Sequence, residues 1–199
     1  MKSEEFATAI CLRAIEPEDL DLLYRIENDT SLWTVGVTNV PYSRYTLHDY
    51  IANSSDDIYA DRQVRLIIEN EAGQTVGIAD LVNFEPRHCR AEIGLVIEQP
   101  HRHKGYARAA IAELERYARA VLHLHQLYLV TASSNEAVIQ LFTSLGYNHT
   151  STLPHWLYDG TCYHDALLLQ KILSTSSYLG HLLPHISHHQ THNQNSYLS

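Results

Sequence analysis

The sequence predicts a mixed fold of the α/β (α+β) class. In this fold a mostly antiparallel central sheet of about seven strands carries helices on both faces. Strand, helix and strand alternate only in the middle of the chain, between residues 90 and 131, and hairpin patterns lie on both sides of that stretch. An apolar fraction of 45% in 199 residues is sufficient for one hydrophobic core. We therefore expect one domain over residues 1–173, followed by a polar tail.

The expected elements follow from periodicity and from capping or turn residues. In chain order they are a strand at 10–15, a helix from Pro17 to about Asn28, a helix at 47–53, a hairpin of strands at 64–69 and 75–84, a strand at 90–97, a helix at 105–122, a strand at 126–131, a helix from Ser134 to before Gly146, and an antiparallel pair at 148–158 and 162–171.

Local signals in the first half place these boundaries. Pro17 is followed by three acidic residues, which is typical of the first turn of a helix. The Ser-Ser-Asp-Asp run at 54–57 ends the second helix. Residues 70–73, Asn-Glu-Ala-Gly, provide the turn of the first hairpin.

The second half contains the strongest periodic segments. Residues 90–97 end in a nearly continuous apolar run, as expected for a central strand that is buried on both faces. Residues 105–122 repeat apolar side chains at helical spacing. Asn135 is suited to begin the next helix, and Gly146 to end it. Asp159 and Gly160 form the turn of the closing pair.

Composition excludes several classes of protein. The net charge of -9 argues against nucleic acid as a partner, and no apolar run approaches the roughly 20 residues that span a bilayer. Residues 1–6 lack the apolar core of a signal peptide, so we expect a cytoplasmic protein without a membrane partner. The three cysteines, at 11, 89 and 162, are widely spaced without a CxxC motif. They are therefore interpreted as free or buried thiols, and no metal site is predicted.

Charge and histidine are unevenly distributed. Between Glu16 and Asp61 there are ten acidic residues against two arginines. This excess either attracts a cationic substrate or only confers solubility. Residues 174–199 are rich in Ser, His, Asn and Gln, so we expect a flexible tail. A metal-binding role is its less favoured alternative.

One motif points to chemistry. Residues 102–107, Arg-His-Lys-Gly-Tyr-Ala, follow the apolar strand residues 93–97 and open the helix at 105–122. Backbone N–H groups at the start of a helix have no intrahelical partner, and the helix dipole adds partial positive charge there. A basic turn in this setting predicts an anion site, usually for phosphate.

Four segments together resemble the GCN5-related N-acetyltransferase (GNAT) family, and within it the ribosomal-protein and spermidine acetyltransferase branch. They are Ala91 to Ile97, the Arg102-x-x-Gly105-x-Ala107 motif, the Asn135-Glu136-Ala137 segment, and the Leu141-Phe142-x-x-Leu145-Gly146-Tyr147 motif. The resemblance covers about residues 10–171 and is strongest over 90–147. It implies acetyl-CoA as co-substrate and direct transfer of the acetyl group to a primary amine.

The resemblance also implies which residues hold the cofactor. The pyrophosphate would be bound by Arg102, His103, Lys104, Gly105, Tyr106, Ala107 and Arg108. The pantetheine arm would pair with Leu95, Val96 and Ile97, and the Leu95 N–H would donate to the thioester oxygen. Asn135 would contact the cofactor from the next strand–helix junction. Simple surface charge is the alternative role for Lys104 and Arg108, and a helix N-cap is the alternative for Asn135.

Glu92 is the candidate catalytic residue. It places a carboxylate inside an otherwise apolar strand, where a charge is costly. A primary amine with a pKa of about 10 is mostly protonated near pH 7, so its acetylation needs a base. The alternative is that Glu92 lies at the edge of the strand and pairs with Arg87 or Arg90.

The chain departs from the family pattern at two places. Phe142 stands where many members have a Tyr that protonates the leaving thiolate, and Val138 stands where ribosomal-protein relatives have a Ser. Water, Tyr147 or Tyr163 could supply that proton instead. Residues 37–41 also lack the acidic pair of the spermidine enzymes.

Three acceptors therefore stay open: a protein N-terminus, slightly favoured by resemblance, a polyamine, or another small amine. The chain could assemble as a homo-oligomer. A non-catalytic acyl-CoA-binding sensor or assembly module is the alternative function.

Overall fold

The computed structural model describes residues 8–32, 40–55 and 57–173. In these residues the elements are β1 (Ile10–Ala14), α1 (Leu20–Glu27), α2 (Arg44–Ala52), α3 (Ile58–Asp61), β2 (Val64–Asn70), β3 (Thr75–Glu85), β4 (Arg90–Ile97), α4 (Tyr106–Ala120), β5 (Gln126–Ala132), α5 (Glu136–Ser144), β6 (Asn148–Tyr158) and β7 (Tyr163–Ile172). Short 3-10 turns occupy Pro17–Asp19, Pro86–His88 and Gln99–His101. The expected tail at 174–199 lies outside the described residues.

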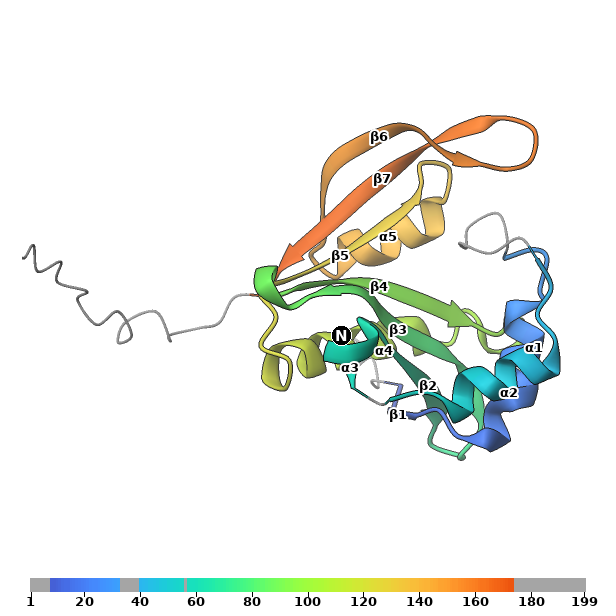
Figure 1. Cartoon of the computed structure of the whole chain (residues 1–199). Helices are drawn as coiled ribbons and strands as arrows, with labels where there is room; N and C mark the ends of the chain where they lie inside the picture. The colour runs from blue at the N-terminus through green and yellow to red at the C-terminus, as the bar shows by residue number, and fades with distance from the viewer. Residues whose placement is uncertain (1–7, 33–39, 56, 174–199) are drawn as a thin grey trace, which may run out of the picture.

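The strands form one seven-stranded sheet in the order β1-β2-β3-β4-β5-β7-β6 (Figure 1). Neighbouring strands are antiparallel except β4 and β5, which are parallel. The expected mixed, mostly antiparallel sheet is therefore confirmed. Its single parallel pair is the one that the α4 crossover connects.

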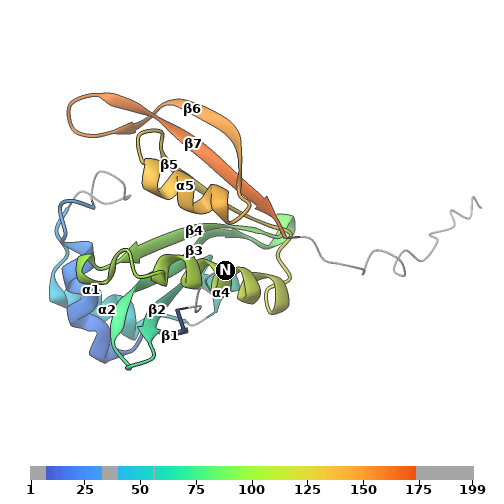
Figure 2. The same ribbon diagram turned by 180° about the vertical axis from the view of Figure 1, so that it is seen from behind.

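Helices cover the sheet from both faces. On one face α4 and α5 pack into the larger core, whose buried members include Ile111, Leu114 and Phe142. On the other face α1 and α2 pack with Ile67, Ile78 and Val96 in a second cluster. Figures 1 and 2 show α5 beside the β5–β7–β6 part of the sheet, and α1 with α2 near the β1–β4 part.

Two helices, α2 and α3, differ from what the sequence predicted. α2 begins at Arg44, three residues before the expected start, because the Ser43 hydroxyl oxygen accepts a hydrogen bond from the Thr46 N–H at 3.0 Å. The four-residue α3 was not expected. The Asp57 side chain caps it, within a segment that had been interpreted only as the end of the previous helix.

In the described part of the chain no helix is long and apolar enough to cross a bilayer. All three cysteines are free thiols and exposed.

Candidate active site

The two parallel strands separate after a short contact. β4 and β5 are in register only at three pairs, from Arg90–Gln126 to Glu92–Tyr128. Beyond them, Ile93 to Ile97 of β4 are paired only with β3, and the rest of β5 is paired only with β7. We call the two facing, unpaired edges, residues 93–97 and 129–132, the fork. Figure 2 shows β4 and β5 diverging here.

The backbone of Leu95 faces the fork. The Glu98 N–H donates to the Val76 carbonyl on β3, and the Val96 carbonyl also faces β3, since a Cβ on Gly77 would lie 2.1 Å from its oxygen. Backbone groups alternate in direction along a strand, so those of Leu95 point the other way. Within the described strands the fork therefore presents an unpaired N–H and C=O at the residue expected to contact the thioester.

The facing edge of β5 also points backbone groups into the fork. The Gln126 N–H donates to the carbonyl of Cys89, beside β4, so by the same alternation the backbone of Val130 faces the fork. An extended chain placed in the fork could therefore form strand-like hydrogen bonds with β4 or β5.

The basic turn lies at the carboxyl end of β4 and leads into α4. His103 and Gly105 both have left-handed backbone conformations, with φ of 60° and 85°. Gly105 is the N-cap of α4 and has no side chain with which to cap the helix. The N–H groups of the first turn, Tyr106 to Arg108, therefore have no intrahelical partner. A 15-residue helix with an open N-terminus suits an anion at this position.

Gly105 is required for a reason that the sequence did not reveal. A Cβ at this position would lie 2.6 Å from Thr8 Oγ1, and the Thr8 hydroxyl donates to the Lys104 carbonyl at 2.9 Å. The segment before β1 therefore fixes the turn from outside. This packing adds to the positive φ, which already favours glycine.

The charged residues of the turn differ in their attachment. Arg102 Nε donates to the Ile97 carbonyl at 3.0 Å, which joins the turn to the end of β4. Arg108 donates to Ser144 Oγ on α5 at 2.8 Å, so its guanidinium is held between the two helices. His103 and Lys104 are exposed. All four lie at the same end of the sheet as the open part of the fork.

Asn135 stands at the start of α5, where the other branch of the fork ends. Its Oδ1 accepts from the Val138 N–H at 3.4 Å, so its role as a helix N-cap is confirmed. Among the described residues its side-chain NH2 group has no hydrogen-bond acceptor, and a contact with the cofactor stays a prediction.

Glu92 is half-buried and lies just before the strands separate. Its Oε2 accepts from Asn83 Nδ2 at 2.8 Å. Within the described residues no ion pair joins Glu92 to Arg87 or Arg90, so the alternative pairing is not observed. The carboxylate is held by a neutral amide.

Asn83 was missed by the sequence reasoning. It has φ of 49° and sits in an irregularity of the β3–β4 register between Val82 and Glu85, which turns its amide toward Glu92. On the other side of Glu92, burial and then the Glu92 charge raise the pKa of Tyr128. A pocket of about 430 Å³ opens here; its lining is Arg62, Asn83, Phe84, Glu85, Arg90 and Tyr128.

The Glu92 side chain is on the α1 and α2 face of the sheet. Val96 packs into the cluster under these helices, and side chains alternate along a strand, so Gly94 and Glu92 share its face. Asp80 on β3 lies against Gly94, where a Cβ would be 3.1 Å from Asp80 Cβ. An acceptor that approaches Glu92 must therefore come from this face.

A buried ion network occupies the same face and was also missed. Arg65 makes two hydrogen bonds of 3.0 Å to Asp80 and one of 2.5 Å to Glu27. The Tyr50 ring lies 5.7 Å from the guanidinium carbon. Burial raises the pKa of Asp80, and Arg65 opposes that rise. Arg65 thus pairs with the carboxylates of both Asp80 and Glu27. Glu92, in contrast, has no cationic partner among the described ion pairs.

The candidate proton donors occupy different surroundings. Phe142 is 3% exposed and packs edge-to-face on Tyr147 with ring centroids 4.9 Å apart. Tyr147 is enclosed in the same core, where burial and then Glu115 raise its pKa, so it is unsuited to deliver a proton. Tyr163 is exposed at the tip of the β6–β7 hairpin. Neither Tyr147 nor Tyr163 is therefore an enclosed proton donor at the fork.

Comparison with known proteins decides the family. The model of the acetyltransferase (GNAT) domain matches residues 9–148. The chain belongs to the GNAT family. The expected acyl-CoA-dependent N-acetyltransferase activity, with acetyl-CoA as co-substrate, is confirmed on this basis.

Similar proteins share most of the chain. Spermidine N(1)-acetyltransferase of Escherichia coli (strain K12) is 27% identical over 161 residues, covering 81% of this chain and 84% of the relative. The Vibrio cholerae enzyme of the same name is 25% identical over 171 residues, covering 84% and 97%. A crystal structure of the Vibrio cholerae enzyme with CoA and spermine has a TM-score of 0.76 at 22% identity, over 82% of this chain and 95% of that one, which confirms the fold.

Proposed function

We propose that this N-acetyltransferase acetylates a primary amine of a polyamine by direct transfer from acetyl-CoA bound in the fork. The observation that carries the proposal is the backbone of Leu95, which faces the fork where β4 is no longer paired with β5. The N-terminus of α4, whose first N–H groups have no intrahelical partner, lies next to it. A pantetheine arm contains amides that can pair with such an edge, and the pyrophosphate beyond it requires N–H donors.

The proposed cofactor contacts follow from this placement. The arm pairs with Leu95, Val96 and Ile97, and the pyrophosphate lies on the backbone of residues 102–108. Lys104 and Arg108 add positive charge there. Asn135 approaches from the start of α5 with its free amide. In this proposal the thioester lies near Leu95, inside the fork.

The proposed chemistry uses Leu95 and Glu92. The Leu95 N–H donates to the thioester oxygen, which becomes negative as the amine nitrogen attacks the carbonyl carbon. Glu92 takes the proton of the amine. At about 3.3 Å per residue the two residues are about 10 Å apart along β4, so the proton moves through water. The carbon–sulfur bond then breaks, the nitrogen gives up its second proton to solvent, and CoA leaves as the thiolate, which takes a proton from solvent.

Two observations support a polyamine as acceptor. Residues 16–61 carry ten acidic side chains against two arginines, which favours a cation on this side of the molecule. The relatives from Escherichia coli and Vibrio cholerae are named for spermidine. The segment at 37–41 lacks the acidic pair of the spermidine enzymes, and its residues 37–39 lie outside the described residues.

Assembly and location remain proposals. A dodecameric structure of the Vibrio cholerae enzyme, 25% identical with a TM-score of 0.70, supports a homo-oligomer. The absence of nucleic-acid and membrane partners and the cytoplasmic location stay predictions from sequence.

The test is thiol release from acetyl-CoA with spermidine, spermine and a peptide with a free N-terminus. We expect turnover with the polyamines and little with the peptide. The reverse order would replace the polyamine with a protein N-terminus. Tight binding of acetyl-CoA without release for any acceptor would instead support the non-catalytic module.

The role of Glu92 is tested with Glu92→Gln, which keeps the size of the side chain and its contact with Asn83. We expect kcat to fall by about 10²–10⁴-fold while the affinity for acetyl-CoA is unchanged. Glu71→Gln, in the exposed turn between β2 and β3, is the matched control. Unchanged turnover of the Glu92 variant across the whole pH profile would refute its role as base.

A further inference from the structure

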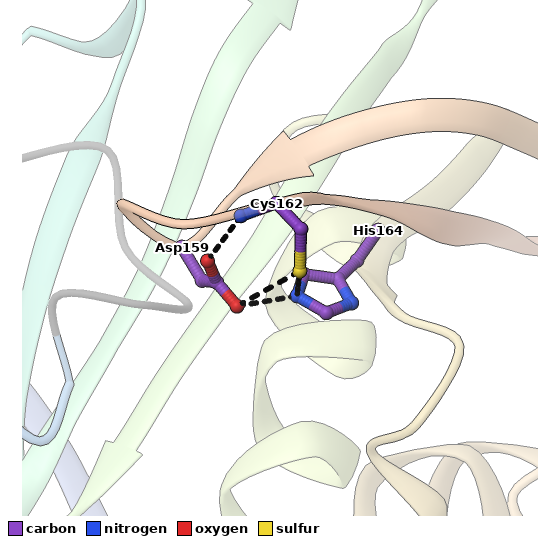
Figure 3. A group of neighbouring side chains, drawn as sticks. All are labelled: Asp159, Cys162 and His164. Carbon is purple, nitrogen blue, oxygen red and sulfur yellow. Dashed lines mark hydrogen bonds and ion pairs between the residues drawn. The ribbon is translucent and has the colours of Figure 1, made fainter.

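We propose that Asp159, Cys162 and His164 form a Zn²⁺ site at the tip of the β6–β7 hairpin. The three residues lie in the turn and at the start of β7, and their side chains converge (Figure 3). One potential ligand atom from each lies within 4.8 Å of the others. The proposal concerns a site separate from the fork and does not depend on the acetyl acceptor.

The distances fit a small tetrahedral ion. His164 Nε2 is 3.3 Å from Cys162 Sγ and 2.5 Å from Asp159 Oδ2, and the sulfur is 3.6 Å from the same carboxylate oxygen. Zinc bonds of about 2.3 Å to sulfur and about 2.0–2.2 Å to nitrogen and oxygen require ligand atoms about 3.4–3.6 Å apart. The sulfur–oxygen separation agrees and the sulfur–nitrogen separation is about 0.1 Å short, whereas the nitrogen–oxygen separation must widen by about 0.9 Å, which requires the His164 ring to rotate away from Asp159.

The turn already orients the carboxylate. Asp159 Oδ1 accepts the N–H groups of Thr161 and Cys162 at 2.7 and 2.9 Å. Oδ2 is thereby aimed at Cys162 and His164. A carboxylate fixed by backbone donors is the kind of support that metal ligands receive in proteins. The Asp159 carboxylate is therefore already oriented to bind an ion.

The geometry argues against a nucleophilic triad. In a triad the histidine contacts the nucleophile with one ring nitrogen and the acid with the other. Here the Cys162 sulfur and the Asp159 carboxylate both approach Nε2.

Charge and ligand type select the metal. Residues 148–170 contain no lysine or arginine. A thiolate and a carboxylate together neutralise a divalent cation, and the set of sulfur, imidazole and carboxylate suits Zn²⁺ better than Mg²⁺ or Ca²⁺. Three protein ligands leave the fourth position to water. The register places the site beyond Ala132, at the end where β5 stops, so the ion would fix a hairpin tip that projects past the fork.

The first experiment titrates the metal-free, full-length protein with Co²⁺ and records thiolate-to-metal charge-transfer absorption, which Zn²⁺ should then abolish. We expect the band in the wild type and its loss in Cys162→Ser. The matched controls Cys11→Ser and Cys89→Ser, which replace the other two exposed thiols, should retain it. Residues 174–199 contain histidines but no cysteine, so metal bound there gives no such band.

The second experiment measures Zn²⁺ affinity by competition with a chelating dye, with the five histidines of residues 174–199 replaced by Asn in every protein. Asp159→Asn keeps the oxygen that accepts the turn N–H groups, and His164→Asn removes the imidazole. We expect each to weaken binding by at least about 10-fold, with the metal-free Tm nearly unchanged. Absence of the Co²⁺ band in the wild type, its persistence in Cys162→Ser, or unchanged affinity in both other variants would overturn the proposal.

Discussion

Replacing Arg65 with methionine should destabilise the protein by about 3–5 kcal/mol at pH 7, the usual cost of removing one partner of a buried ion pair. The guanidinium makes two bonds of 3.0 Å to Asp80 and one of 2.5 Å to Glu27. Asp80 is 9% exposed, so little water reaches the carboxylate that would lose its cation. A domain is stable by about 5–15 kcal/mol in total, so the loss would be a large fraction.

The loss should depend on pH in a defined direction. Burial raises the pKa of Asp80, and without Arg65 that pKa rises further. A carboxyl whose pKa is higher in the folded than in the unfolded state favours folding below the unfolded value of about 3.9. It loses that contribution as pH rises through the folded value. The variant should therefore lie closer to the wild type at pH 5 than at pH 7.

Urea unfolding at both pH values measures this loss, and the double variant with Asp80→Asn should recover part of it. Arg116→Met, which removes an exposed ion pair with Glu113, is the control and should move the midpoint little. A loss for Arg65→Met below about 1 kcal/mol, or the same loss at both pH values, would refute the assignment of a buried, charge-dependent brace.

Three further predictions concern the fork. Gly105→Ala should lower Tm and raise KM for acetyl-CoA, and the control Gly73→Ala should change both quantities less. Both glycines have positive φ, but a Cβ at Gly73 would meet no atom within 4 Å. Equal effects of the two substitutions would contradict the packing argument. Leu95→Pro should reduce kcat/KM while the protein still folds. Val96→Pro, which removes a hydrogen bond to β3, should prevent folding. If both variants lost the same amount of circular dichroism signal, the derived backbone directions would be wrong. Asn135→Ala should cost about 1 kcal/mol in urea unfolding through its cap, and an added loss of acetyl-CoA affinity in calorimetry would show a cofactor contact.

The sequence was most informative where one segment contains its own signal. The apolar strand at 90–97 and the amphipathic helix that follows were placed within two residues of β4 and α4. The basic turn between them also lies where the sequence placed it, between the carboxyl end of β4 and the start of α4, and its role as an anion site stays a prediction. These features depend on periodicity and on capping, which neighbouring residues determine.

Features that depend on register could not be predicted in the same way. Arg65 and Asp80 meet because β2 and β3 place them opposite each other. Asn83 reaches Glu92 because the β3–β4 register shifts between Val82 and Glu85. Neither contact has a signature in spacing along the chain. The Asp159-x-x-Cys162-x-His164 spacing was visible, but only the turn conformation brings the ligand atoms together.

Because of the fork, β4 has backbone amides open to solvent, as an edge strand does, although it lies in the middle of the sheet. In the free protein the amide of Leu95 should exchange its hydrogen for deuterium quickly, while those of Gly94 and Val96, which face β3, exchange slowly. β4 would then show alternating fast and slow uptake in the middle of a sheet. Acetyl-CoA should slow the exchange at Leu95 and remove the alternation, which would make this one amide a reporter of occupancy that requires no turnover.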